Sequence, residues 1–180
     1  MSRLLIVAYP NISKSDFEWI QDNRRRYDKL SYRALLPHFT LFFPSDEFES
    51  DDLLRIAKRN IGSFSSFQFS LRSAIVMPSV VGEYSYVFLV PDEGFSDVVQ
   101  LHDKIYSREL RSCLRLDIPF VPHITVASSK KVAVCKELVD VLNDKKFEVT
   151  GRVQSLDLVF EDGNRITTVS QIRLSRIVIR

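Results

Sequence analysis

One short string occurs twice in this chain, and it constrains the fold more than any other feature of the sequence. Residues 35–41 (LLPHFTL) and 120–126 (FVPHITV) match in residue type at every position. The chain has three histidines, and two of them stand in this Pro-His-x-Thr string. Each copy predicts a short strand after a proline, and a helical pattern follows each copy. The repeat predicts one domain, residues 1–180, with two lobes related by approximate two-fold symmetry.

The rest of the chain mixes strand and helix patterns without strict alternation. Apolar runs and period-two alternation predict strands at residues 4–9, 38–43, 67–77, 84–90, 122–127, 147–160 and 166–179. Helical spacing predicts helices at residues 13–27, 50–61, 95–110 and 128–142, with N-caps at Ser13 or Ser15 and at Ser128 or Ser129. Hairpins join the third strand to the fourth, and the last two strands across residues 161–164 (EDGN). This order favours an α+β fold with antiparallel sheet.

Composition narrows the class of protein. The chain is 45% hydrophobic with 13 Phe, which is enough for a sizeable core. Its formal net charge is only +2, whereas general nucleic-acid binders are usually more basic. No apolar run approaches the roughly 20 residues of a membrane helix, and the N-terminus lacks the pattern of a signal peptide. We expect a cytoplasmic protein with reduced cysteines, monomeric and without an obligate protein partner.

The repeated motif places its polar residues on one face of a strand. Residues i and i+2 of a strand point to the same side, so His38 and Thr40 point together. Phe39 points to the opposite face, where it anchors the strand in the core. His123 and Thr125 repeat this arrangement. A rigid element therefore carries each imidazole-hydroxyl pair, as catalytic geometry requires.

Two imidazoles and two hydroxyls suit the chemistry of a phosphate ester. The unperturbed pKa of histidine, about 6.5, allows one ring to accept a proton from water while another donates one to a leaving oxygen. Threonine hydroxyls can donate hydrogen bonds to the non-bridging oxygens of the phosphate. A 2′,3′-cyclic phosphate fits this demand, and the reaction needs neither a nucleophilic side chain nor a metal. We therefore expect no cofactor.

Other interpretations of the histidines exist. His38 and His123 could be structural residues with satisfied hydrogen bonds at the starts of two strands. A metal site would require further ligands, and neither motif has a second histidine at ligand spacing or a nearby cluster of acidic residues and cysteines. The third histidine, His102, lies among apolar residues at helical spacing, which is typical of a helix face or core edge.

Further side chains are candidates for contact with the substrate. An arginine run at residues 24–26 could clamp a phosphate at the mouth of a cleft, or it could be a solvated helix face. Aromatic residues on strands could stack on a base, although such residues usually lie in the core. The candidates for substrate contact are Tyr9, Arg25, Tyr86, Phe120 and Lys130.

The two motifs resemble the paired His-x-Thr motifs of the 2H phosphoesterase superfamily, also called the 2′-5′ RNA ligase-like family. The resemblance extends over nearly the whole chain and includes the apolar first strand and the Phe-x-Val-Pro-His approach to the second motif. It implies a bilobal 2H phosphoesterase fold, with two antiparallel sheets and outer helices around a central cleft. It also implies that His38 and His123 are the acid-base pair and that Thr40 and Thr125 hold the phosphate.

The resemblance further implies a division of labour, in which His123 activates water and His38 protonates the leaving oxygen. The residues alone leave either histidine as the acid. Bacterial members often carry an arginine shortly after the second motif, where this chain has residues 127–130 (ASSK). The expected activity is therefore hydrolysis of a cyclic nucleotide, an RNA end or a related 2′-5′ linkage rather than RNA ligation. The alternative is a module that binds nucleotides or RNA ends without turnover, and a third possibility is a structural protein without cleft chemistry.

Overall fold

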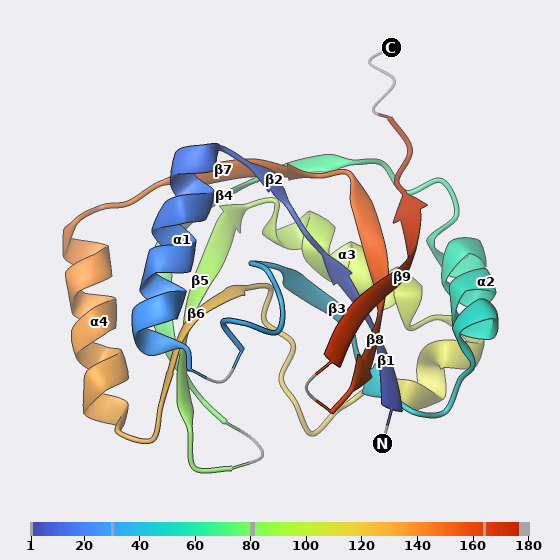
Figure 1. Ribbon diagram of the computed structural model, residues 1–180. Coiled ribbons are helices and arrows are strands. Elements are labelled where there is room, and N and C mark those ends of the chain that lie inside the picture. Colours follow the sequence, from blue (N-terminus) through green and yellow to red (C-terminus); the bar gives the residue numbers. More distant parts are fainter. Residues whose placement is uncertain (1, 30, 80–81, 164, 177–180) are drawn as a thin grey trace.

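The computed structural model describes residues 2–29, 31–79, 82–163 and 165–176 (Figure 1). The strands are β1 (Ser2–Ala8), β2 (Asn11–Ile12), β3 (Phe39–Ser45), β4 (Phe67–Pro78), β5 (Ser85–Glu93), β6 (Ile124–Ser129), β7 (Val149–Val153), β8 (Ser155–Asp162) and β9 (Arg165–Arg173). The helices are α1 (Lys14–Tyr27), α2 (Ser50–Ile61), α3 (Phe95–Ile105), the 3₁₀ helix η1 (Arg108–Cys113) and α4 (Val132–Asp144).

Two antiparallel sheets form the framework, which confirms the expected α+β fold. One has the strand order β3-β1-β8-β9 and the other has the order β2-β7-β4-β5-β6. Each copy of the repeated motif lies on a strand at the edge of its sheet. β3 pairs with β1 alone, and β6 pairs with β5 alone, among the described residues. The two motifs therefore come from different sheets.

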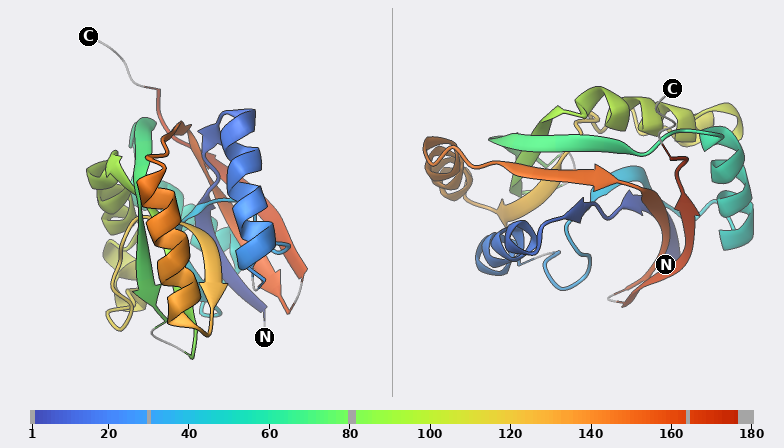
Figure 2. Two further views of the ribbon diagram at one scale, coloured as in Figure 1. Left: turned by 90° about the vertical axis from the view of Figure 1, so that its left-hand side faces the viewer. Right: turned by 90° about the horizontal axis from the view of Figure 1, so that it is seen from above.

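The helices lie on the outer sides of the two sheets and connect them (Figure 2). α1 precedes β3 but packs against β6, and α3 precedes β6 but packs against β3. The element orders β1-α1-β3 and β5-α3-β6 correspond to each other, and one hydrophobic core contains residues of both sheets. A single domain with two pseudo-symmetric lobes stays a prediction. None of the described helices is long and apolar enough to cross a membrane.

The start of α1 follows the sequence prediction, but the start of α4 does not. The backbone N–H of Asp16 donates to the Ser13 hydroxyl at 3.0 Å, an N-cap that contributes about 1 kcal/mol. The prediction of a cap at Ser128 or Ser129 was wrong, because α4 begins only at Val132. Ser128 is a residue of β6, and its hydroxyl donates to the buried carboxylate of Asp28 at 3.0 Å.

The predicted helix at residues 95–110 is shorter than expected. α3 ends at Ile105, and a 3₁₀ helix follows from Arg108, whose φ is 53°. The buried amide of Asn60 donates to the carbonyls of Ile105 at 3.1 Å and Ser107 at 2.8 Å. These carbonyls have partners outside the helix, so the chain can leave the helical path without burying unpaired acceptors.

The predicted single strand at residues 147–160 is two strands, and they belong to different sheets. β7 joins the five-stranded sheet and β8 joins the four-stranded sheet, with Gln154 at the crossing. The carbonyl of Gln154 accepts a hydrogen bond from the N–H of Leu174 at 2.9 Å. A Cβ at Gly151 would lie 2.7 Å from the ring of Phe69, so this close approach requires glycine.

Both predicted hairpins are confirmed. β4 pairs with β5, and β8 pairs with β9, in antiparallel register. The predicted strand end at residues 177–179 and position 164 of the last turn lie outside the described residues. The first hairpin and its partner strand β6 form one wall of the site described next.

Candidate active site

The two motif strands present the same alternation of exposed and buried residues. Phe39 and Ile124 have exposed fractions of 1% and 0%. The side chains of the motif's polar face are all partly exposed: His38, Thr40, His123 and Thr125. The alternation holds each imidazole and its hydroxyl on the side of the strand that faces away from the core.

Both histidine rings are held in the same orientation by the backbone. The Nδ1 of His38 lies 2.7 Å from the carbonyl oxygen of Leu36, and the Nδ1 of His123 lies 2.5 Å from that of Val121. A carbonyl can only accept a hydrogen bond, so Nδ1 carries the proton and donates in both rings. Nε2 is therefore the nitrogen that is left to accept or donate a proton.

The surroundings keep both histidines neutral near pH 7. Burial lowers the pKa of His38 to about 4, the backbone hydrogen bond opposes this, and the charges of Arg24 and Asp28 act in opposite directions. Burial also lowers the pKa of His123 to about 4, against its own backbone hydrogen bond, and a positive charge on His38 lowers it further. The two rings therefore lie within electrostatic reach of each other.

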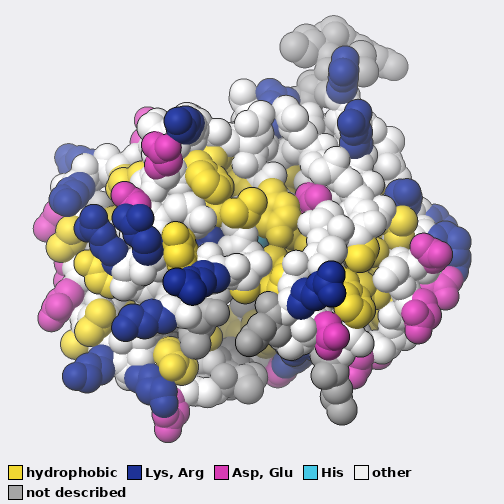
Figure 3. All heavy atoms as spheres, in the orientation of Figure 1, with side chains coloured by type: hydrophobic (Ala, Val, Ile, Leu, Met, Phe, Trp, Pro, Cys, Tyr) yellow, Lys and Arg dark blue, Asp and Glu magenta, His cyan; other side chains and the backbone are white. Residues whose placement is uncertain are grey.

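One cavity of about 330 Å³ collects residues of both motifs, and this volume is in the range of small-molecule sites. Its lining contains Thr40 from β3 together with His123 and Thr125 from β6, while His38 lies beside these residues rather than in the lining. None of the described lining residues is charged at pH 7. In Figure 3 a histidine is visible at the floor of a central hollow between hydrophobic side chains. The remaining lining residues are Phe43, Met77, Pro78, Ser79, Tyr86, Phe88, Ile118, Pro119, Phe120 and Val121.

Aromatic rings form the wall of the cavity on the His123 side. The ring of Phe88 stacks on His123, with centroids 3.4 Å apart and planes 9° apart, and Tyr86 stacks on Phe88 at 6.0 Å. Phe120 also lines the cavity and stacks on the buried ring of His102 at 3.6 Å. Such rings offer flat surfaces on which a nucleobase can stack. Sequence reasoning did not select Phe88, although its alternation with Tyr86 was the available signal.

On the other side of the site, His38 lies against Tyr9 rather than against a stacked wall. The ring centroids are 6.1 Å apart, and the planes meet at 74°. Burial raises the pKa of Tyr9 to about 12, with Asp157 acting in the same direction and Arg24 against it. The phenol therefore stays protonated. Tyr9 contacts the histidine but is not among the described residues that line the cavity.

A buried ion pair lies next to His38. The side chains of Arg24 and Asp28 have relative exposures of 2% and 0%, with Nε and Oδ2 3.6 Å apart. Asp28 accepts hydrogen bonds from the N–H of Ser31 at 3.3 Å and the hydroxyl of Ser128 at 3.0 Å. Arg24 donates to Gln21 and to the carbonyl of Ser31. The pair thus connects α1 and the chain segment before His38 to β6. The sequence left the arginine run as either a phosphate clamp at a cleft mouth or a solvated helix face, whereas its first member, Arg24, is buried.

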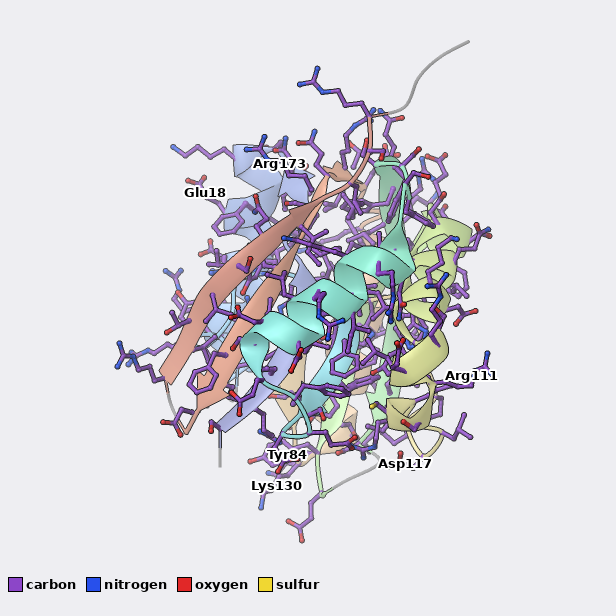
Figure 4. All side chains as sticks on the ribbon, turned by 90° about the vertical axis from the view of Figure 1, so that its right-hand side faces the viewer. Glu18, Tyr84, Arg111, Asp117, Lys130 and Arg173 are labelled. Atoms are coloured by element: carbon purple, nitrogen blue, oxygen red, sulfur yellow. The ribbon has the colours of Figure 1, made fainter. Side chains whose placement is uncertain are left out.

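Two more of the predicted substrate contacts, besides Tyr9, lie outside the cavity. Arg25 forms an ion pair with Asp22 at 2.8 Å on the exposed side of α1. Lys130 pairs with Glu83 at 2.9 Å and lies 5.6 Å from the centre of the Tyr84 ring. Figure 4 labels Lys130 and Tyr84 at the same end of the molecule. Neither Arg25 nor Lys130 is in the described lining of the cavity, whereas Tyr86 and Phe120 are.

Two imidazoles come together at this site, one from each motif. Among residues 2–29, 31–79, 82–163 and 165–176, no three His, Cys, Asp or Glu side chains gather as they would to hold a metal ion. Cys113 and Cys135 are free thiols. What the arrangement can supply is a proton acceptor or donor from each half and a hydroxyl donor from each half.

Comparison with known proteins places these features in context. The model of the 2′-5′ RNA ligase superfamily matches residues 12–165, which include both Pro-His-x-Thr motifs. A comparison with curated proteins found no match. The solved structures, in contrast, include many of similar fold.

Three solved structures illustrate the likeness. The protein TT0787 of Thermus thermophilus is 16% identical, with a TM-score of 0.61 over 97% of this chain and 98% of that chain. Escherichia coli LigT in complex with 3′-AMP is 18% identical, with a TM-score of 0.59 over 97% and 99% of the two chains. Kluyveromyces marxianus Usb1 is 11% identical, with a TM-score of 0.57 over 96% and 98%. These likenesses confirm the expected fold.

Proposed function

The chain belongs to the 2′-5′ RNA ligase superfamily, and from this membership we propose that it hydrolyses a 2′,3′-cyclic phosphate of a nucleotide or RNA end, or a related 2′-5′ linkage. The observation that carries the proposal is the meeting of the two motifs. Thr40, His123 and Thr125 line one cavity although they come from the edges of two sheets, and protonation of His38 would lower the pKa of His123.

The reaction divides between the two rings. Nε2 of His123 takes a proton from water as the water oxygen attacks phosphorus. The bond between phosphorus and one ribose oxygen breaks, and that oxygen takes a proton from Nε2 of His38. The products are a phosphomonoester and a free ribose hydroxyl. The hydroxyls of Thr40 and Thr125 donate hydrogen bonds to the non-bridging oxygens while charge builds up on them.

The general acid must be protonated before it can act, and binding of the anionic substrate is what makes its protonation favourable. With a pKa of about 4, neither histidine carries a proton on Nε2 at pH 7 in the free protein. An anionic phosphate between the rings stabilises the imidazolium form and raises the pKa of both. Substrate binding is thus coupled to the uptake of a proton, and the acid forms only when a phosphate is present.

The lining of the cavity favours a singly charged substrate. A cyclic phosphodiester carries one negative charge, whereas a phosphomonoester carries nearly two at neutral pH. No lysine or arginine is among the described lining residues, so the imidazolium that forms on binding balances one negative charge, and the second charge of a dianion would be desolvated without a partner. The hydrolysis product is the more highly charged species and should leave readily. The wall of Tyr86, Phe88 and Phe120 suits a base, in line with the 3′-AMP bound to the E. coli relative.

A binding module without turnover is the second candidate, and one observation favours it. Both histidines are neutral at pH 7, so the free protein holds no proton donor at this site. If the bound phosphate did not raise the pKa of one ring, the cavity would bind a nucleotide and leave its ester intact. Cytoplasmic location remains part of the proposal in either case.

The test is a turnover assay with matched variants. Purified protein is incubated with 2′,3′-cyclic nucleotides and with 2′-5′ dinucleotides, alongside His38→Ala and His123→Ala, with and without a chelator. We expect hydrolysis of a cyclic nucleotide that the chelator leaves unchanged and that each substitution nearly abolishes. Nucleotide binding without turnover of any substrate would establish the second candidate. Activity that survives both substitutions would overturn the assignment of the site.

A further inference from the structure

A second hollow lies at the corner where the chain passes from one sheet to the other. It has a volume of about 740 Å³, and no residue of the first cavity contributes to it. The crossing at Gln154 brings the ends of β7 and β9 and the start of β4 to this corner. The residues that line it are Ser66, Arg152, Gln154, Ser155, Gln171, Arg173, Leu174 and Arg176.

The charged residues in the described lining of this hollow are all positive. It contains three arginines, Arg152, Arg173 and Arg176, and no aspartate or glutamate is among its described lining residues. None of the three forms an ion pair within the part of the chain that the structure describes. Arg72 shows the opposite case, since Asp92, Glu93 and Glu148 all form ion pairs with it. Like charges repel one another, so a bound anion would relieve the repulsion among three unpaired guanidinium groups at one hollow.

The backbone around the three arginines is held by hydrogen bonds. The N–H of Leu174 donates to the carbonyl of Gln154 at 2.9 Å, which fixes the ends of β7 and β9 together. The N–H of Ser66 donates to the carbonyl of Ser175 at 2.8 Å, directly before Arg176. Arg152 is half-buried and reaches the hydroxyl of Ser66 at 3.5 Å. The positions of the arginine backbones are therefore set before any ligand arrives.

We propose that this arginine hollow, defined by Arg152, Arg173 and Arg176, is a phosphate-binding site separate from the catalytic cavity. The choice of phosphate follows from the side chains: a guanidinium group donates two parallel hydrogen bonds to phosphate oxygens, and the hollow has no lysine among its described lining residues. The hydroxyl of Ser155 and the amide of Gln154 add neutral donors. The amide of Gln171 already donates to Asp157 at 3.3 Å and is not counted.

The hollow lies far from the catalytic hairpin. Figure 4 labels Arg173 at the opposite end of the molecule from Tyr84 and Lys130, which flank the β4–β5 hairpin beside the catalytic cavity. A phosphate in the hollow therefore cannot be the one that is hydrolysed. It can come from the backbone of a single-stranded RNA or from a separate mononucleotide, and the experiment distinguishes these sources.

The experiment measures binding without turnover, so it does not depend on the proposed hydrolysis. A fluorescent oligouridylate with a free 3′-hydroxyl is titrated with protein over a range of salt concentrations, and UMP is titrated by calorimetry. The variants are Arg173→Glu and Arg152→Glu/Arg173→Glu. The control is Arg111→Glu, because Arg111 is also an exposed arginine without an ion pair in the described structure and lies away from Arg173 (Figure 4).

We expect the double variant to bind the oligouridylate at least about tenfold more weakly, and each lost phosphate contact to lower the salt slope by about 0.7. Arg111→Glu should bind as the unmodified protein does. If the double variant loses affinity for the oligouridylate alone, the ligand of the hollow is an RNA backbone. If it loses affinity for UMP as well, the ligand is the phosphate of a mononucleotide. Equal affinity and equal salt slopes for the double variant and the control would overturn the proposal. Turnover of a cyclic mononucleotide should be the same in all these proteins.

Discussion

The two copies of the motif share a backbone but differ in their surroundings. His38 and His123 each donate Nδ1–H to the carbonyl two residues before, and each stands beside a threonine on an edge strand. His123 lies flat against the neutral ring of Phe88, whereas His38 lies beside the charges of Arg24 and Asp28. The difference teaches that the motif fixes the direction of each ring, whereas the packing around each ring differs. Under the proposed mechanism, these unlike neighbours would separate the acid from the base. Unequal surroundings are what an acid-base pair requires.

The largest expected effect comes from removing either ring, and the leaving group can tell the two apart. His38→Ala and His123→Ala should each lower kcat/KM for a 2′,3′-cyclic nucleotide by about 10²–10⁴-fold, the usual contribution of a positioned acid or base. A phosphodiester with a nitrophenolate leaving group needs no protonation as it departs. On that substrate His38→Ala should regain most of the loss, and His123→Ala should not.

The assignment of acid and base is decided by steady-state rates of the unmodified protein, His38→Ala and His123→Ala. Each is measured on the cyclic nucleotide and on the nitrophenyl ester. If His123→Ala were the variant that recovers, the roles of the two rings would be reversed. If neither recovered, the histidines would not act as separate acid and base.

The buried ion pair makes the His38 side more vulnerable to a single change. Asp28→Ala leaves the guanidinium of Arg24 buried without its carboxylate, which should cost about 3–5 kcal/mol of unfolding free energy. It also removes the negative charge that raises the pKa of His38. Urea denaturation measures the first effect. The matched control is Asp22→Ala, an exposed carboxylate on the same helix, which should change the free energy by less than about 0.5 kcal/mol.

The hydroxyls should behave alike, in contrast to the rings. Thr40→Val and Thr125→Val keep the shape of the side chain and remove one donor to a phosphate oxygen. Each should lower kcat/KM by about 10–100-fold for both the cyclic nucleotide and the nitrophenyl ester, because non-bridging oxygens gain charge in both reactions. A strong effect of one substitution and none of the other would show that the phosphate lies in only one half of the site.

The smallest expected effect concerns stability against pH, to which both rings contribute in the same sense. Each histidine has a pKa of about 4 in the folded protein and about 6.5 when unfolded, so the unfolded chain binds more protons between these values. Stability should be complete above pH 6.5 and should fall as the pH drops toward 4. The loss should be below about 3 kcal/mol per ring, since both rings are partly exposed. Urea midpoints of His38→Asn/His123→Asn should depend less on pH, and an unchanged dependence would contradict the low pKa values.

Local patterns predicted most of the elements of this fold. The cap at Ser13, both hairpins and the strands of the two motifs follow from residues near one another in the sequence. The crossing at Gln154 does not, because the strand pattern continues through it and only the pairing of β7 and β8 with different partners reveals the break. In the same way, the end of α3 depends on a hydrogen bond from Asn60, which lies on a helix that is distant in sequence.

The sequence could indicate only part of the candidate site, for a similar reason. The duplicated motif directed attention to the residues that the two sheets bring together, and Tyr86 and Phe120 reach the same cavity. Arg24 differs from Arg25 in continuing the helical spacing of the apolar face of α1, but its charge made burial unexpected. Its burial depends on the ion pair with Asp28, which Ser128 of β6 holds by a hydrogen bond. The arginine hollow likewise joins three positions that only the sheet crossing brings together.

The most direct measurement is an NMR titration of the two imidazoles in the presence and absence of a 3′-nucleotide. The Cε1–H signals of His38 and His123 are followed against pH, with assignments from the two alanine variants. A shared phosphate should raise both pKa values from about 4 into the neutral range. If either signal titrates as in the free protein when the nucleotide is bound, the two rings do not face one phosphate and the acid-base pair does not exist.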